Sequence, residues 1–276
     1  MNKLDAYSMD GLGNDFIIFD KRKKPLALTR EEIVKISDRK NIGCDQVIFI
    51  SNDYDNKTML TFYNSDGGEI SACGNGSRCA AYLLMKEKNQ NKISLKTKSG
   101  ILEAEIDKNN LVRINMGQPN FDWKKIPLIK NIDNKNLKIK ITNDYKQIIE
   151  GGFSLSVGNP HVVFFVDDFD KFDLAKIGPE IENHKYFPEK CNVTLATILD
   201  KKSIKIKVWE RGAGLTKACG TAACATAVAA SVLNLTDRSI NIEFKKGILN
   251  IDWKLNNNSI YMTGKVSKVK KIIINI

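Results

Sequence analysis

One short motif occurs twice in this chain, and each copy places a cysteine before the small residues typical of a helix start. The first copy reads CGNGSRCA from Cys73, and the second reads CGTAACA from Cys219. The two cysteines are 146 positions apart (219 − 73). This spacing is far longer than the roughly 20–45 residues of a solenoid repeat. The repeat therefore predicts two similar domains, each with a cysteine at the start of a helix.

Other parts of the sequence recur in the same order and support a duplication. Three further landmarks are repeated at offsets of 145 to 147 residues, namely Gly13 and Gly158, Cys44 and Cys191, and Asn64 and Glu210. The alternative is that two unrelated helices both begin with small residues. Four landmarks in one order favour the duplication.

Strand patterns dominate the chain, and three segments predict helices. Short apolar or alternating runs bounded by Gly, Asn and Asp, such as VIFI at 47–50, predict many short strands. The predicted helices span 29–38, 76–88 and 222–233, and the last is almost entirely small and apolar, which favours burial. We predict an α+β fold of two similar halves related by a pseudo-two-fold axis. Each half is expected to wrap a curved, mostly antiparallel sheet or barrel around a central helix.

The domain boundaries are expected near the middle and the end of the chain. The N-terminal half is predicted to span 1–119 and to be completed by 265–276, and the C-terminal half to span 120–264. The segment 120–150 is polar and contains Pro127, so we expect the connection between the halves to start near Pro119. The active site is expected in the cleft between the halves.

Composition argues against several classes of protein. The net charge is +11, but only seven of the 43 basic residues are arginine and the lysines are scattered, so we expect no nucleic-acid partner. The longest apolar runs are too short to span a membrane or to act as a signal peptide, which predicts no membrane partner and a cytoplasmic protein. Six cysteines without a C-x-x-C pair, together with only two histidines, predict no metal site.

A cysteine at a helix start is suited to acid–base chemistry. The first N–H groups of a helix have no internal partners and attract anions. A thiol placed there is expected to have a pKa below the ordinary value of about 8.5, and the same donors can hold a carboxylate. Two such thiols on opposite sides of a carbon suit proton transfer from one face to the other. A hydrolase would need one nucleophile with a separate base, and a redox enzyme would need both cysteines in one loop.

The remaining cysteines are expected to be structural. Cys79 and Cys224 fall within apolar helix segments, where a buried and inert thiol is the usual finding. Cys44 and Cys191 are ambiguous, although packing is favoured.

Several polar residues are candidates for substrate contacts. Glu210 and Arg211 are adjacent and suit the ammonium and carboxylate of an amino acid, although a surface ion pair would look the same. His161 could tune a thiol or could be a structural histidine. The asparagines at expected loop positions either bind substrate or form turns, and they are Asn14, Asn64, Asn75, Asn159 and Asn192.

The combined motifs resemble the diaminopimelate epimerase family over the whole chain. They are MDGLGNDF from Met9, FYNSDG from Phe62, CGNGSRC from Cys73, GNPH from Gly158 and WERGAG with ACGT from Trp209. The resemblance implies interconversion of LL- and meso-diaminopimelate in lysine and peptidoglycan-precursor biosynthesis. It further implies no pyridoxal phosphate, metal or other cofactor, a substrate held between two α/β halves, and a homodimer.

The family's functional residues carry over onto matching positions of this sequence. The resemblance implies that Cys73 and Cys219 are the catalytic thiols and that His161 and Glu210 adjust their pKa values. The implied substrate-binding residues are Asn14, Gln46, Asn64, Gly74, Asn75, Asn159, Asn192, Glu210, Arg211, Gly220 and Thr221.

Three alternatives compete with this interpretation. A related cofactor-independent amino-acid racemase of the proline-racemase type also uses two cysteines, but its motif has His after the first Cys-Gly, where this chain has Asn75. Phenazine-pathway isomerases, which are similar in fold, lack the cysteine pair. A basic protein that binds acidic polymers is a different class, and salt-dependent retention on nucleic acid would indicate it. Dependence of activity on free thiols would indicate the epimerase.

Overall fold

The computed structural model describes residues 3–71, 73–142 and 148–276. The chain divides into two compact units, Met1–Asn115 with Thr263–Ile276 and Met116–Met262. The predicted boundaries at 119 and 264 remain predictions, and they lie a few residues from these divisions. Among the described residues, none of the helices is long and apolar enough to cross a membrane.

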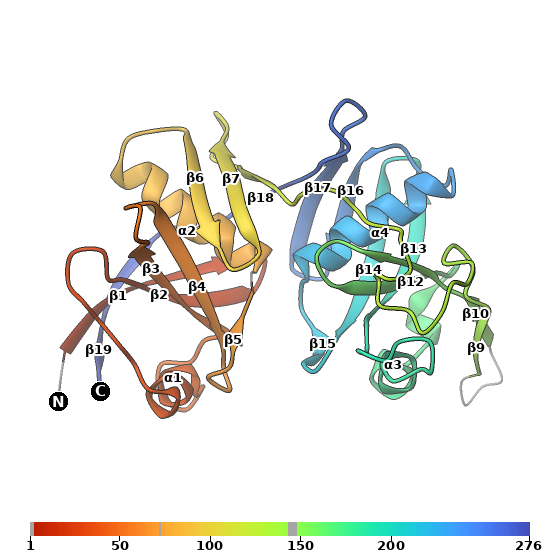
Figure 1. Cartoon of the computed structure of the whole chain (residues 1–276), viewed down its shortest axis with the longest axis horizontal. Helices are drawn as coiled ribbons and strands as arrows, with labels where there is room; N and C mark the ends of the chain where they lie inside the picture. Colours follow the sequence, from red (N-terminus) through yellow and green to blue (C-terminus); the bar gives the residue numbers. More distant parts are fainter. Residues whose placement is uncertain (1–2, 72, 143–147) are drawn as a thin grey trace. The chain divides into compact units, whose positions relative to one another are not determined.

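The first unit contains the described strands up to Asn115, together with the last strand of the chain (Figure 1). Its elements are β1 (Lys3–Gly11), β2 (Asn14–Asp20), α1 (Arg30–Ser37), β3 (Gln46–Asn52), β4 (Thr58–Asn64), β5 (Glu69–Ile70), α2 (Gly74–Glu87), β6 (Lys92–Thr97), β7 (Gly100–Ile106), β8 (Val112–Asn115) and β19 (Lys270–Asn275). β2 pairs with β3 in parallel, β3 with β4 antiparallel, and β4 with β6 in parallel. The pairs β1–β2, β1–β19, β6–β7 and β7–β8 are antiparallel.

The second unit repeats this order of elements after an antiparallel pair of strands of its own. Its elements are β9 (Ile139–Thr142), β10 (Ile148–Gly151), β11 (Phe153–Ser156), β12 (Pro160–Phe165), η1 (Phe169–Lys171), α3 (Leu174–Glu182), β13 (Asn192–Asp200), β14 (Ser203–Glu210), β15 (Gly214–Thr216), α4 (Gly220–Val232), β16 (Ser239–Phe244) and β17 (Gly247–Trp253). The strand β18 (Ile260–Gly264) spans the division between Met262 and Thr263. Again β12 pairs with β13 in parallel, β13 with β14 antiparallel, and β14 with β16 in parallel. The same sequence of pairings in both units agrees with the duplication.

Each unit has one central helix, as predicted. The helix α2 contacts β1, β2, β3, β6, β7 and β8, and α4 contacts β11, β12, β13, β14, β16 and β17. The residues of α4 from Ala222 to Ala230 are all buried, which confirms the burial expected of a helix of small apolar residues. Figure 1 shows each helix lying along the strands of its own unit.

The other helix predictions show where sequence signals succeed and fail. Thr29 caps α1 in a capping box with Glu32, as the Thr-x-x-Glu spacing predicts. The helix α3 is missing from the prediction because Gly178 and Pro179 lie within it. The segment 120–150 is more than a polar connection, since buried residues such as Ile139 join the core of the second unit.

Candidate active site

Cys73 and Cys219 occupy equivalent places at the starts of the two central helices. Each is the N-cap residue, with φ −139° and ψ 115° at Cys73 and φ −135° and ψ 115° at Cys219. The helices therefore begin at Gly74 and Gly220, two residues earlier than predicted. The duplicated motif thus gives each cysteine the same backbone conformation.

The start of α2 packs closely against neighbouring strands. The Gly76 N–H donates to Cys73 Sγ at 3.5 Å, so the helix end offers the sulfur a backbone donor. A Cβ at position 76 would lie 2.8 Å from Ile48 Cδ1 and 3.2 Å from Phe16 Cε1. Glycine is therefore required for the helix start to reach this position.

A tight hairpin brings Asn14 to Cys73. The β1–β2 turn has positive φ at Leu12 (64°) and Gly13 (80°), and Asp10 Oδ1 accepts from the Gly13 N–H at 3.0 Å. Asn14 begins β2 directly after this turn, and Cys73 Sγ donates to Asn14 Oδ1 at 3.8 Å. The structure thus brings together two predicted site residues that are 59 positions apart in the sequence.

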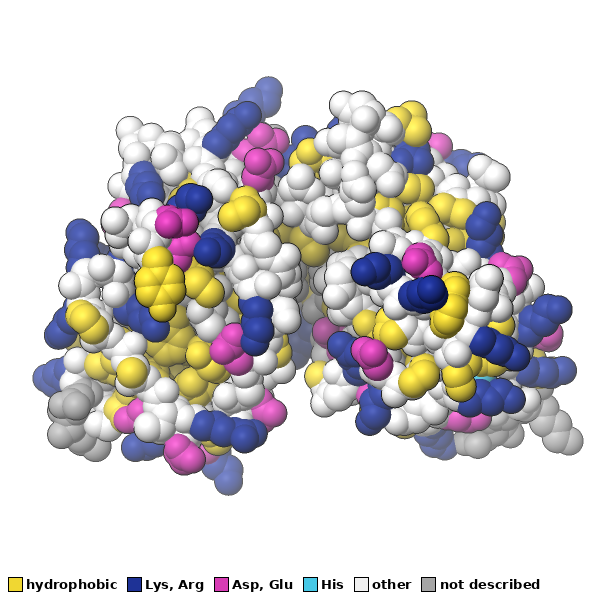
Figure 2. Space-filling view, in the orientation of Figure 1, with side chains coloured by type: hydrophobic (Ala, Val, Ile, Leu, Met, Phe, Trp, Pro, Cys, Tyr) yellow, Lys and Arg dark blue, Asp and Glu magenta, His cyan; other side chains and the backbone are white. Residues whose placement is uncertain are grey.

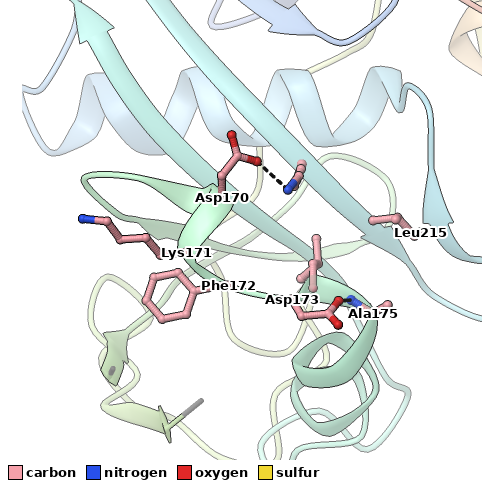
Figure 3. Close-up of a pocket in the computed structure, with 8 residues that line it drawn as sticks. Asp170, Lys171, Phe172, Asp173, Ala175 and Leu215 are labelled. Atoms are coloured by element: carbon pink, nitrogen blue, oxygen red, sulfur yellow. Dashed lines mark hydrogen bonds and ion pairs between the residues drawn. The ribbon is translucent and has the colours of Figure 1, made fainter. Parts of the chain in front are cut away.

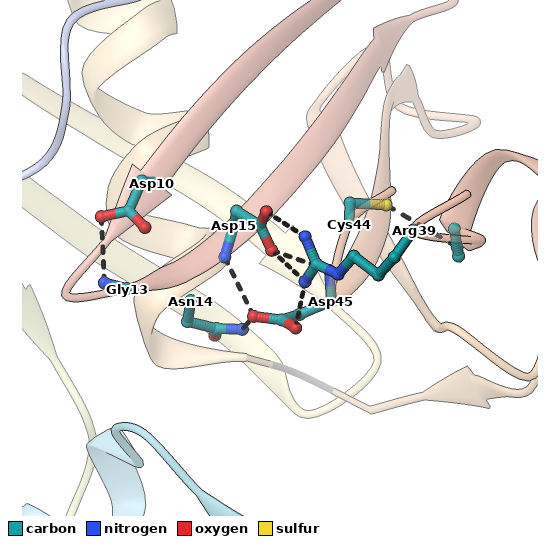
Figure 4. A network of polar contacts seen from close by, with 8 residues as sticks. Asp10, Gly13, Asn14, Asp15, Arg39, Cys44 and Asp45 are labelled. Carbon is teal, nitrogen blue, oxygen red and sulfur yellow. Dashed lines mark hydrogen bonds and ion pairs between the residues drawn. The ribbon is translucent and has the colours of Figure 1, made fainter. Parts of the chain in front are cut away.

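An ion-pair network holds the other end of the Asn14 amide (Figure 4). Asn14 Nδ2 donates to Asp45 Oδ2 at 3.0 Å, and Arg39 Nη2 lies 2.6 Å from Asp45 Oδ1 and 2.7 Å from Asp15 Oδ1. Burial alone would raise the pKa of Asp15, but hydrogen bonds from Arg39 and Asp45 and the charge of Arg39 bring that pKa below its ordinary value. The sequence did not predict this network, although Asp45 lies directly after the repeated Cys44 landmark.

Gln46 and Asn64 lie opposite each other on β3 and β4. Gln46 Nε2 donates to Asn64 Oδ1 at 3.0 Å. Gln46 Oε1 and Asn75 Oδ1 are buried and have no hydrogen-bond partner among the described residues. Both oxygens are therefore acceptors available to a ligand such as an ammonium group.

Cys219 lies among polar groups of the second unit. Its Sγ is 3.3 Å from Thr221 Oγ1. Burial raises the pKa of the Cys219 thiol well above its ordinary value, and the charge of Glu210 and the hydrogen bond that its carboxylate accepts raise it further. Thr221 and the Ala222 N–H oppose this shift. The expected low pKa is therefore wrong for Cys219 in the free protein, because burial and Glu210 outweigh the helix start.

His161 is fully buried and electrically neutral. Burial lowers the pKa of His161 to about 3, and the charge of Arg211 contributes. Its Nε2 lies 3.0 Å from Asn159 Oδ1, and Asn159 Nδ2 donates to Thr221 Oγ1 at 3.5 Å. The structure therefore connects His161 to Cys219 through Asn159 and Thr221.

Glu210 and Arg211 face different partners. Glu210 raises the pKa of the Cys219 thiol. Arg211 Nη1 instead donates to Glu189 O at 2.9 Å. The backbone N–H of Arg211 donates to Asn192 Oδ1 at 3.0 Å, and Asn192 Nδ2 donates to Pro160 O at 2.8 Å. Asn192 thus ties the start of β12 to the end of β14.

A buried carboxylate supports the turn after Arg211. Glu182, which is 5% exposed, accepts from Trp209 Nε1 at 2.6 Å and from the Gly212 N–H at 3.0 Å. Glu182 was not predicted as a site residue, because α3, in which it lies, was not predicted. It anchors both sides of the Glu210–Arg211 pair.

The four other cysteines are buried, in agreement with a packing role. Burial raises the pKa of Cys44 to about 11 and raises the pKa values of Cys79 and Cys191 above the ordinary range. These three thiols remain protonated near neutral pH.

The surface of the second unit has a shallow pocket that includes none of the predicted site residues (Figure 3). Its volume is about 330 Å³, and Lys207 Nζ pairs with Asp170 Oδ1 at 2.7 Å across it. Elsewhere on the face in Figure 2, Lys and Arg side chains are scattered among acidic and uncharged ones. This distribution fits solvated lysines better than a basic binding surface.

Comparisons with known proteins identify the family. The family model described as "Diaminopimelate epimerase" matches twice, over residues 6–122 and 153–269. The chain is 52% identical to the diaminopimelate epimerase of Pelagibacter ubique (strain HTCC1062) over 275 residues, which cover 99% of both chains. It is 42% identical to that of Caulobacter sp. (strain K31), covering 94% of this chain and 93% of the relative.

Solved structures at low identity share the fold. A Bacillus anthracis phenazine biosynthesis protein of the PhzF family has a TM-score of 0.68 at 16% identity and covers 100% of both chains. A hydroxyproline epimerase from Agrobacterium vitis has a TM-score of 0.66 at 11% identity, covering 99% of this chain and 92% of that one. With two matches of the family model and relatives above 40% identity along nearly its whole length, this chain belongs to the diaminopimelate epimerase family.

Proposed function

We propose that this protein interconverts LL- and meso-diaminopimelate by moving a proton between the two faces of Cα, with Cys73 and Cys219 as the acid–base pair. Membership of the family makes it an epimerase of diaminopimelate. The observation that best supports the two-thiol chemistry is the matched N-cap position of both cysteines. Equal placement suits a reaction in which the two groups exchange roles on reversal.

The proton transfer needs no cofactor in this proposal. One sulfur, as thiolate, takes the α-proton, and the electron pair of the C–H bond passes to the carbon and its carboxylate. The other sulfur, as thiol, gives its proton to the opposite face. The active site would lie between the two units, with one thiol on each side of the substrate.

Groups at each helix start are proposed to bind the reacting amino-acid centre. The N–H groups of Gly74, Asn75, Gly220 and Thr221 lie in the first turns of α2 and α4, where helix ends attract a carboxylate. Glu210 is proposed to receive the Cys219 proton, because its carboxylate already accepts from that thiol.

The remaining predicted residues are proposed to hold the rest of the substrate. In the first unit, Gln46 with its free buried oxygen would accept from an ammonium group, next to Asn64 and near Asn14. In the second unit, Arg211 would bind a carboxylate, supported by Asn192. Asn159 would contact the substrate beside Thr221, while His161 would act only as a neutral residue.

The setting of the reaction follows from the same proposal. We propose a homodimer acting in the cytoplasm, in lysine and peptidoglycan-precursor synthesis, with diaminopimelate as its small-molecule partner. Light scattering of the purified protein tests the dimer, for which we expect a mass about twice the 31.0 kDa of one chain.

The substrate assignment is tested with purified protein, without added cofactor, in ²H₂O. LL-diaminopimelate should yield the meso form with deuterium at the inverted Cα, measured by chiral chromatography and mass spectrometry. L-Proline and trans-4-hydroxy-L-proline are the matched controls and should remain unchanged. Inversion of a proline in place of diaminopimelate would contradict the proposal and favour the racemase alternative.

A further inference from the structure

Asn14 and Asn159 occupy equivalent places in the repeat but present opposite ends of their amides toward the cysteines. Asn14 is the first residue of β2, and Asn159 directly precedes β12. Each lies near the N-cap cysteine of its own unit through the contacts described above. The two cysteines share one N-cap backbone conformation, and these side chains give the two sulfurs different hydrogen-bonding partners.

In the first unit, the orientation of the amide is fixed by charge. The Asp45 carboxylate can only accept, so the Asn14 nitrogen must face it at 3.0 Å. Arg39 holds Asp45 in place at 2.6 Å. The oxygen of Asn14 therefore faces Cys73 Sγ at 3.8 Å. This oxygen can accept a hydrogen bond from a thiol but cannot donate one to a thiolate.

In the second unit, a neutral histidine turns the amide the other way. His161 Nδ1 is buried without a partner among the described residues, and an unpaired acceptor costs less than an unpaired N–H. The proton therefore belongs on Nε2, which donates to Asn159 Oδ1 at 3.0 Å. Asn159 Nδ2 then donates to Thr221 Oγ1, which leaves the Thr221 hydroxyl proton for Cys219 Sγ at 3.3 Å.

We propose that this relay, His161 to Asn159 to Thr221, stabilises the thiolate of Cys219, whereas Asn14 stabilises the protonated thiol of Cys73. The inference rests on the proposed function and deepens it, since it makes the two thiols unequal. Cys219 keeps a hydrogen-bond donor at its sulfur once its proton has left, whereas the Asn14 amide offers Cys73 only an acceptor. His161 and Asn159 are positioning residues, and Thr221 touches the reacting sulfur.

The charge of Glu210 acts on Cys219 in the opposite sense to the relay. Glu210 and burial both oppose ionisation in the free protein, and Arg211 acts on His161. Glu210 accepts the departing proton, and the relay supplies the donor that remains on the sulfur. A donor aimed at an anion is stronger than one aimed at a neutral group, so the relay contributes most after the proton has left.

The test is the pH dependence of iodoacetamide alkylation of each cysteine in the full protein without substrate, followed by peptide mass spectrometry. Thr221→Val removes the hydroxyl and should slow alkylation of Cys219 about tenfold at a given pH, as expected for one lost hydrogen bond to a charged group. Cys73 should be unchanged, and Thr221→Ser, which keeps the hydroxyl, should resemble the wild type.

A second variant and a reciprocal one sharpen the test. Asn159→Asp has no donor for Thr221, so Cys219 should again react more slowly, and this variant carries the test if Thr221→Val does not fold. Asp45→Asn should free the Asn14 amide to turn and should speed alkylation of Cys73 only. An unchanged Cys219 profile in the relay variants, or an equal shift at Cys73, would overturn the inference. Because no diaminopimelate is present, failure of the proposed function would appear only in the separate assay of substrate inversion.

Discussion

At the scale of single residues, burial decides the state of the groups around Cys219. His161 is 0% exposed, and its pKa is lowered to about 3 from an ordinary value of 6.5. A cationic histidine is therefore absent near neutral pH, and any influence on a thiol must pass through hydrogen bonds. The GNPH motif marked His161 as a candidate site residue, but its charge and its contact with Asn159 depend on packing.

The lowered pKa of His161 predicts a pH dependence of stability. The unfolded chain takes up a proton on His161 between pH 6.5 and about 3 that the folded chain does not. The stabilisation is thus complete above pH 6.5 and is lost as pH falls, with a limiting slope of about 1.4 kcal/mol per pH unit. In urea unfolding between pH 4 and 7, His161→Gln should reduce this slope by up to that amount. An equal slope in both proteins would show that His161 is protonated in the folded state.

Replacement of Glu210 gives a second prediction at this scale: the reactivity of the Cys219 thiol should rise while epimerisation falls. Glu210→Gln removes the charge that raises the pKa of Cys219 and leaves only a weaker amide acceptor, so iodoacetamide should alkylate Cys219 faster in the free protein. Epimerisation should nevertheless fall, by roughly 10²-fold or more, because the carboxylate no longer receives the proton. Slower alkylation together with normal turnover would show that Glu210 does not act on this thiol.

At the scale of elements, the parts set by local signals were predictable and the parts set by distant contacts were not. The capping box at Thr29 and the small-residue helix after Cys219 depend on neighbours in sequence. The network of Arg39 with Asp45 and the orientation of Asn14 depend on loops that meet only in the folded unit. Local patterns carry no information about which end of an amide faces a sulfur.

The helix α3 illustrates a local signal overruled by packing. Gly178 and Pro179 read as a break, yet a Cβ at position 178 would lie 2.6 Å from the Trp209 ring, so glycine allows close packing here. Gly178→Ala should lower the free energy of unfolding by about 1–3 kcal/mol, as overpacking does. The exposed helix position Glu180→Ala is the control and should change it by less than about 0.5 kcal/mol. Urea unfolding measures both, and a Gly178→Ala protein as stable as the control would show that Trp209 moves aside freely.

At the scale of the whole molecule, the duplication is the feature that sequence, structure and family comparison share. The family model matches two segments whose starts are 147 residues apart (153 − 6), and the units repeat the same pairing order. The proposal that Cys73 and Cys219 face each other between the units can be tested with a crosslink.

Mild oxidation with diamide should inactivate the protein by linking Cys73 to Cys219. A disulfide needs Cα atoms about 4.4–6.8 Å apart, so only thiols that face each other across a closed site can form it. Dithiothreitol should restore activity, and bound diaminopimelate should protect by keeping the sulfurs apart. Peptide mapping identifies which cysteines are linked. A disulfide between other cysteines would contradict the proposal that Cys73 and Cys219 face each other.

The central claim is that each cysteine serves one face of the substrate carbon. The most direct test is inversion of LL-diaminopimelate in ²H₂O by Cys73→Ala and Cys219→Ala, with Cys79→Ala as a control for loss of a buried thiol. Both catalytic variants should stay folded by circular dichroism and lose about 10²–10⁴-fold or more in inversion, since each removes a general acid–base group. The control should retain the turnover and deuterium incorporation of the wild type. Near-normal inversion by either catalytic variant would contradict the two-thiol mechanism.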